Sequence, residues 1–97
     1  MSISRAAADY GRSISDQALT VSSVAVGLTV PAGSVAAMIT NGAEPVRMRW
    51  GTPTASVGHY LNPYSVVDLY EWDLATIKFI RISSDSDIHI TYFGEAG

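Results

Sequence analysis

The chain has 97 residues, of which 15% are charged, and its formal net charge is −3 at pH 7. A chain of this length forms one domain, because a second hydrophobic core does not fit. The fraction of charged residues is below the roughly 25% of an ordinary soluble domain, which favours a protein whose surface packs against partners. The single lysine and the negative net charge argue against a nucleic-acid binder, which needs clustered positive charge.

The chain contains no cysteine, so it has no disulfide, thiolate nucleophile or cysteine-zinc site. Residues 17–43 carry no charge, but glycine, proline, asparagine and several hydroxyl residues interrupt the run. A membrane-spanning helix needs about 20 mainly apolar residues, so we expect no membrane span. The first 17 residues have no apolar core, and we therefore expect no secretion signal.

The chain divides into residues 1–17 and residues 18–97. The first part mixes small, polar and charged residues without sustained periodicity. It is predicted to be an extended N-terminal arm that orders on a partner, and a solvated tail is the alternative. The second part is predicted to form the folded domain.

Strand patterns begin at residue 19 and continue through residues 26–30 to a turn at Pro31-Ala32-Gly33. Residues 35–40 are almost continuously apolar, which suits a strand covered on both faces. The dipeptide Asn41-Gly42 favours a two-residue hairpin turn. We therefore expect residues 35–40 to pair with residues 44–50, with Pro45 at a strand start or an edge.

Residues 46–61 contain the strongest strand pattern of the chain. Three apolar residues alternate with two arginines, so an extended backbone places the two kinds on opposite faces. The apolar residues are Val46, Met48 and Trp50, and the arginines are Arg47 and Arg49. Gly51-Thr52-Pro53-Thr54 then interrupts the pattern, and residues 57–61 resume it. A hairpin with a long, rigid loop is predicted.

Three further strands are expected at residues 66–70, 77–82 and 88–93, the last two as a hairpin. Between them, residues 71–75 are predicted to make one helical turn across the end of the sheets, with Trp72 and Leu74 as a plug. Seven or eight short strands with turns at this spacing predict an all-β chain. The expected fold is a single small jelly-roll-like or β-sandwich domain of antiparallel strands.

Signals for a metal site are weak. His59 and His89 lie on different predicted strands without the spacing that places two imidazoles on one zinc ion, so hydrogen-bonded or solvent-facing histidines are favoured. Asp85 and Asp87 resemble part of a calcium loop, but its glycine and distal glutamate are missing. We interpret them as a solvated hairpin tip, and we predict no metal and no cofactor.

Several residues are candidates for contacts with partners. Arg47 and Arg49 suit pairing with acidic residues of another subunit, and solvation is the alternative. Glu71 and Asp73 flank Trp72, an arrangement also found where a sugar stacks on an indole, although a core or rim aromatic is the favoured interpretation. Tyrosines in the second half of the chain add interface-type surface, or are simply good strand formers. The candidate interface residues are Arg5, Arg12, Arg47, Arg49, Tyr64 and Trp72.

No arrangement of nucleophile, base and acid, and no phosphate-binding loop, can be assembled from the sequence. The chain is therefore predicted not to be an enzyme, and we name no catalytic residues.

The run AAMITNGAEPVRMRWGTPTASVGHYL, followed by VVDLY and IKFIRISSDSDIHITYF, resembles small β-domain structural proteins of tailed-bacteriophage virions. The resemblance covers residues 19–93. In that family an apolar strand leads to an acidic residue and proline, then to a strand with arginine and a glycine-proline-glycine-histidine loop. The matching positions are Glu44, Pro45, Arg47, Gly51, Pro53, Thr54, Gly58, His59, Tyr92 and Phe93. Trp50 departs from the pattern, in which a small or polar residue precedes the loop.

The resemblance implies a structural virion protein, foremost a capsid cement or decoration protein. Such a protein binds the outer capsid through the major capsid protein or another virion protein, as a homo-oligomer, and needs neither nucleic acid nor a membrane. A tail, collar or fibre component is the first alternative. A carbohydrate-binding module that uses Trp72 and nearby tyrosines is the second.

Overall fold

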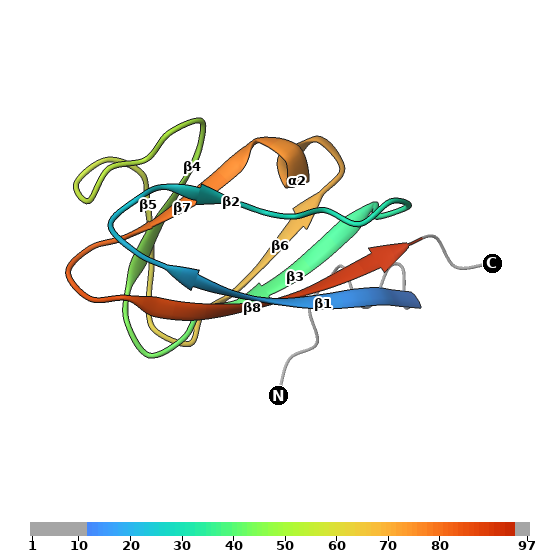
Figure 1. The fold of residues 1–97 in the computed structure, drawn as a ribbon, viewed down its shortest axis with the longest axis horizontal. Coiled ribbons are helices and arrows are strands. Elements are labelled where there is room, and N and C mark those ends of the chain that lie inside the picture. The colour runs from blue at the N-terminus through green and yellow to red at the C-terminus, as the bar shows by residue number, and fades with distance from the viewer. Residues whose placement is uncertain (1–11, 95–97) are drawn as a thin grey trace.

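A computed structural model describes residues 12–94 of the chain, which form two four-stranded antiparallel sheets and one helical turn (Figure 1). The elements are β1 (Arg12–Val21), β2 (Val26–Gly27), β3 (Ala36–Thr40), β4 (Val46–Trp50), β5 (His59–Leu61), β6 (Val66–Tyr70), α2 (Trp72–Thr76), β7 (Ile77–Arg81) and β8 (Ser86–Gly94). The prediction of a small all-β sandwich is confirmed.

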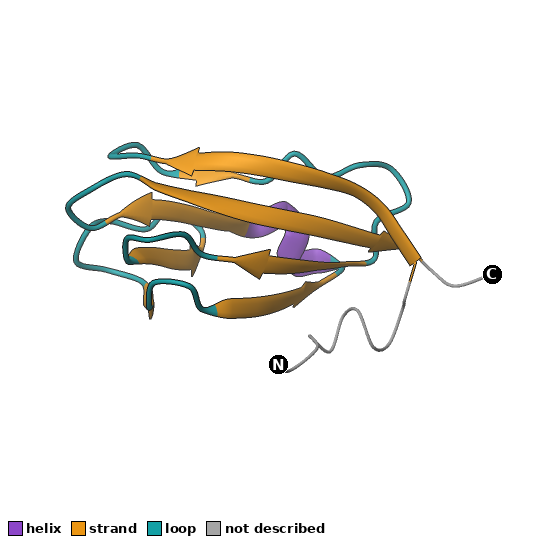
Figure 2. Cartoon of the chain, turned by 90° about the horizontal axis from the view of Figure 1, so that it is seen from below, coloured by secondary structure: helices purple, strands orange, loops and turns teal. Residues whose placement is uncertain are grey.

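The two sheets interleave in sequence. The first sheet, sheet A, has the strand order β1-β8-β3-β6, and the second, sheet B, has the order β2-β7-β4-β5. Among the described strands, only β4 and β5 follow one another within the same sheet, and every other connection crosses from one sheet to the other. Figure 2 shows the result from the side, with strands stacked in layers and α2 (purple) at one end. Adjacent parts of the sequence therefore face each other across the core.

The predicted hairpin between residues 35–40 and 44–50 is wrong. Strand β3 pairs with β6 and β8, whereas β4 pairs with β5 and β7 in the other sheet. The reason lies in Asn41, which is only 1% exposed. Its side-chain amide donates to the carbonyl oxygens of Glu44 at 2.9 Å and Asn62 at 3.0 Å, so it holds a crossing between sheets instead of a tight turn.

The predicted hairpin between residues 77–82 and 88–93 is also wrong, because β7 lies in sheet B and β8 in sheet A. Both strands alternate apolar and polar residues, as expected. Their buried residues, such as Phe79 and Ile90, meet in the core from opposite sheets. Alternation shows that one face of each strand is buried, but it does not show which strand is the hydrogen-bonded neighbour.

The predicted hairpin of residues 46–61 is confirmed. Val46 pairs with Leu61, Arg47 with Tyr60, and Met48 with His59. Its loop turns through Gly51 and Gly58, whose φ angles of 109° and 138° favour glycine.

The chain enters the sandwich earlier than predicted. Residues 12–17, assigned to the N-terminal arm, belong to β1 and pair with β8. Their polar character fits an edge strand with an exposed outer face. Residues 1–11 lie outside the described residues. Of the strand expected at residues 26–30, only Val26–Gly27 is one.

The core lies between the sheets. It consists of Val21, Ala37, Ile39, Val46, Met48, Leu61, Leu69, Leu74, Ile77, Phe79, Ile88, Ile90 and Tyr92. Leu74 of α2 closes one end, as predicted, but Trp72 points outward and is 86% exposed. Trp50 was expected to share the buried face of β4, yet it lies beyond the end of the core and is 48% exposed. A five-residue helix buries one stripe only, so it cannot bury both Trp72 and Leu74.

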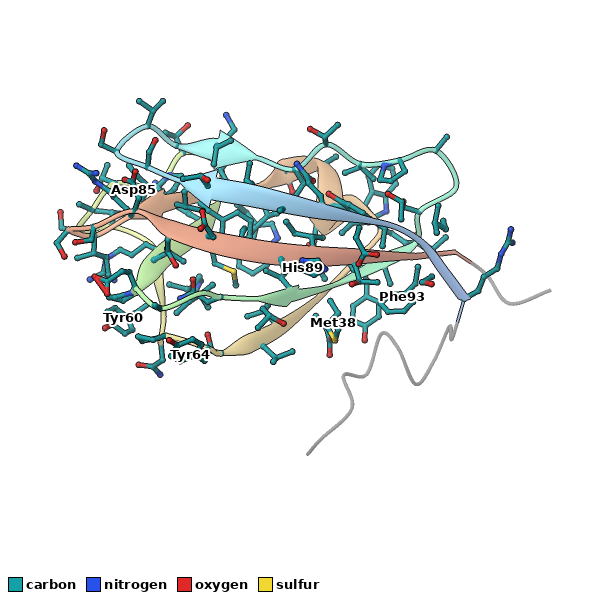
Figure 3. The ribbon with its side chains drawn as sticks, turned by 60° about the horizontal axis from the view of Figure 1, so that its bottom comes forward. Met38, Tyr60, Tyr64, Asp85, His89 and Phe93 are labelled. Atoms are coloured by element: carbon teal, nitrogen blue, oxygen red, sulfur yellow. The ribbon has the colours of Figure 1, made fainter. Side chains whose placement is uncertain are left out.

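Strand β3 is covered on both faces at its start, which confirms that expectation. Ala37 and Ile39 face the core. On the outer side of sheet A, Ala36 and Phe93 form a second buried cluster against Met38 and Tyr70 (Figure 3).

Tyr92 is a sensitive probe of this core. It is fully buried, its hydroxyl donates to Gln17 Oε1 at 2.6 Å, and burial raises its pKa to about 12. Because the folded pKa exceeds the usual value of 10.0, the stabilisation is complete below pH 10 and is lost as the pH rises towards 12. We expect Tyr92→Phe to flatten this alkaline loss and to cost about 1 kcal/mol at pH 7.

Urea unfolding between pH 7 and pH 12 measures both effects. The matched control is Tyr60→Phe, since Tyr60 is half exposed at the surface. Parallel pH profiles for Tyr92→Phe and the parent chain would contradict the assignment.

Candidate binding surface

Large exposed apolar side chains concentrate in one segment of the chain. Of nine such residues, six come from the end of β4, the β4–β5 loop, β5, the β5–β6 turn, β6 and the start of α2. They are Trp50, Val57, Tyr60, Tyr64, Val66 and Trp72, and we call this group the exposed edge. Strands β5 and β6 are edge strands of their respective sheets, and a turn joins them. Concentrations of exposed apolar surface of this kind mark interaction sites.

Trp50 links three elements at one end of this edge. Its indole Nε1 donates to Asp73 Oδ1 of α2 at 2.8 Å. Its ring meets His59 of β5 edge to face, with centroids 5.6 Å apart and an interplanar angle of 83°. The indole is therefore fixed in orientation although half of it is exposed, so a partner meets a preorganised surface.

Arg47 fixes the neighbouring loop. Its Nε donates to the carbonyl of Ala55 at 2.9 Å, and its Nη1 donates to that of Gly58 at 3.0 Å. The guanidinium also lies over the Tyr60 ring, 5.7 Å from its centroid. Arg49 contacts the same loop through Nη1 and the Thr52 carbonyl at 3.3 Å. Both arginines lie on the outer side of β4, as predicted, and both make contacts within the chain.

Trp72 stands beside a shallow hollow of about 380 Å³, lined by Ser34, Val35, Glu71, Trp72 and Ala75. The backbone of Glu71 has φ 38° and ψ −100°, which is unusual for a residue other than glycine. This turn directs the indole away from the core while Leu74 enters it. Ser34 Oγ is buried and has no hydrogen-bond partner among residues 12–94. The hollow thus combines an aromatic plane, a carboxylate and a hydroxyl.

A polar cluster on the outer side of sheet A was not predicted. Asp16 Oδ1 accepts from Thr91 Oγ1 at 2.6 Å and lies 3.1 Å from His89 Nε2. The hydrogen bond from Thr91, then that from His89, lowers the pKa of Asp16. Asp16 had been assigned to the arm, so the sequence gave no reason to place it beside residues far along the chain.

The other predicted residues lie apart from one another. Tyr64 occupies the β5–β6 turn with φ 63° and is 70% exposed; Figure 3 shows it near Tyr60, at the opposite end of sheet A from Phe93. Arg12 begins β1 opposite Gly94. Arg5 is outside the described residues. The six candidates therefore do not form one site, and only Tyr64 and Trp72 belong to the exposed edge.

Metal-type residues do not gather in the part of the chain that the structure describes, where no group of three or more His, Asp or Glu residues could hold an ion. Asp85 pairs with Arg81 at 2.6 Å, and Asp87 accepts from Thr20 at 2.8 Å. His59 and His89 are in different sheets. The two aspartates thus bind neighbouring side chains of the strands.

Comparisons with protein-family models, curated proteins and solved structures found no match. Within residues 12–94, no helix is both long and apolar enough to span a membrane.

Arg47 offers a direct test of how the loop is held. Removing two hydrogen bonds from a charged donor frees the loop, so we expect Arg47→Ala to lower the free energy of unfolding by about 1 to 3 kcal/mol. Amide hydrogen exchange in residues 52–58 should accelerate. Arg49→Ala is the matched control, because Arg49 makes only one, longer bond to the loop. Equal exchange rates in the two variants would contradict this role.

Proposed function

We propose that this chain is a structural protein of a tailed-phage particle, foremost a cement or decoration protein that binds the outer capsid. The observation that carries the proposal is the exposed edge, where two tryptophans and two tyrosines project from a β-sandwich. Tryptophan and tyrosine are enriched in protein interfaces because they bury a large area while ordering few torsions. The resemblance to virion proteins described above supports the same assignment.

The edge is suited to covering a seam between other subunits. Its side chains come from edge strands and short connections, so they protrude from the side of the sandwich instead of lining a cleft. Trp50 and the β4–β5 loop are already held by hydrogen bonds, which reduces the conformational entropy lost on binding. On a symmetric shell, many copies multiply a modest contact into strong attachment.

The direct experiment begins with particles purified from cells that carry this gene. We expect quantitative mass spectrometry to find the chain in a fixed ratio to the major capsid protein. Adding the purified chain to shells that lack it should raise their disruption temperature. A few copies per particle would indicate the tail or fibre alternative, and particles free of the chain would end the proposal.

Variants of the exposed edge connect the surface to attachment. Tyr60→Ser combined with Tyr64→Ser should weaken shell binding at least tenfold, since hot-spot residues each contribute about 2 kcal/mol or more. The control is Val24→Ser, which changes a 71% exposed side chain outside the edge. Shell binding that falls equally in both variants would contradict the role of the edge.

A second candidate function rests on the hollow beside Trp72. An exposed indole plane with a carboxylate and a hydroxyl nearby matches the chemistry of a sugar ring, which offers an apolar face and hydroxyl groups. Carbohydrate binding at this site is compatible with a virion location, because the hollow and the Tyr60-Tyr64 part of the edge involve different residues.

The second candidate has its own experiment. A glycan array probed with the labelled chain should give a signal that Trp72→Ala abolishes and Tyr64→Ala preserves. A silent array, or a signal unchanged in Trp72→Ala, would reject carbohydrate binding at the hollow. Neither result bears on attachment through Tyr60 and Tyr64.

A further inference from the structure

The charges of the strands separate onto the two outer faces of the sandwich. On sheet B, the outward positions of β4 and β7 carry Arg47, Arg49 and Lys78. On sheet A, the outward positions of β1, β8 and β6 carry Asp16, Asp87 and Asp68. We call these the basic face and the acidic face. The only other titratable strand residue that faces outward among them is His89, which contacts Asp16 on the acidic face.

The basic face is electrostatically unbalanced within the chain. Arg49 and Lys78 lie directly opposite one another on paired strands, and like charges in this position destabilise a sheet. Both are exposed. The loops that border this face, residues 22–25, 28–34 and 51–58, contain no charged residue, so they supply no acidic partner. An anionic surface brought against β4 and β7 relieves this repulsion.

The acidic face provides such a surface. Asp16 and Asp87 are exposed, and Asp68 is half-buried. Asp16, Thr91, Met38 and Asp68 form one row across the four strands of sheet A. Strands are about 4.8 Å apart, so this row spans about 14 Å and is wide enough to face both β4 and β7 of another molecule.

We propose that copies of this chain associate heterologously, with the basic face of one copy against the acidic face of the next. The two faces lie on opposite sides of one sandwich, so the contact does not pair a surface with itself. Heterologous contacts of this kind generate rings when the rotation closes and filaments when it does not. Charge complementarity selects a second copy as the partner, and this inference does not depend on the proposed function.

Sedimentation velocity of the full chain at several concentrations tests the proposal. Salt at about 0.02 M and about 0.5 M gives Debye lengths of roughly 20 Å and 4 Å. We expect association at low salt to weaken about tenfold or more at high salt, because exposed ion pairs are screened. A chain that stays monomeric at low salt and about 0.1 mM, or that associates equally at both salt concentrations, would overturn the inference.

Charge reversal on each face separates this contact from other forms of association. Arg49→Glu with Lys78→Glu makes both faces acidic, and Asp16→Lys with Asp87→Lys makes both basic, so neither variant should associate alone. Mixed together they should associate again, because each then finds an opposite face. Circular dichroism melting checks that both variants fold, and the salt series on the unaltered chain remains decisive where one does not.

Two controls exclude other partners. Glu44→Lys with Glu71→Lys changes the net charge equally outside the two faces and should leave low-salt association within about twofold of the parent. Loss of association in this variant would indicate a net-charge effect and contradict face-to-face contact. Association that disappears after nuclease treatment would show that the basic face binds nucleic acid, which would likewise overturn the proposal.

Discussion

The buried amide of Asn41 holds together the connections on which this sandwich depends. It donates to carbonyls of the segments after β3 and after β5, and its Oδ1 accepts from Ser86 Oγ at 3.0 Å and from the Gly42 amide at 2.9 Å. One side chain thus joins the β3–β4, β5–β6 and β7–β8 connections. A buried polar group must be paired, so this site fixes three crossings at once. Gly42 is required beside it, because a Cβ there would collide with the Asp87 carbonyl.

These crossings determine which surfaces are free. Since nearly every connection passes between the sheets, the hairpin of β4 and β5 is the exception, and it ends sheet B with a short edge strand. The edge receives the aromatic side chains that the core cannot accommodate, with Trp50 and Trp72 just beyond the buried layer. The Glu71 backbone and the Trp50-Asp73 hydrogen bond keep these rings outward. The exposed edge is therefore a consequence of the topology as much as of composition.

The sequence was informative where the structure is local. Alternation located most strands, and the β4–β5 hairpin followed from glycine and proline between two β-type runs. Strand pairing was a different matter, because Asn41-Gly42 and Asp85 to Asp87 look like hairpin turns but connect different sheets. The deciding contact, from Asn41 to Asn62, spans 21 positions. The Asp16, His89 and Thr91 cluster joins residues up to 75 positions apart, which no local pattern encodes. Only Tyr64 and Trp72 among the interface candidates lie on the exposed edge.

The exposed edge and the two charged faces occupy different sides of the sandwich, so their uses are compatible. Contacts between opposite faces are dominated by charge, which sets register and depends on salt, whereas the edge offers aromatic area that salt affects little. Copies joined face to face leave each edge uncovered and repeat it at the thickness of one sandwich. Such repetition raises the effective concentration of every edge near a partner with a matching repeat. A chain with few charges therefore gains selectivity from where they lie: Arg49 and Lys78 bring the copies together, and the aromatic edge holds what the copies cover.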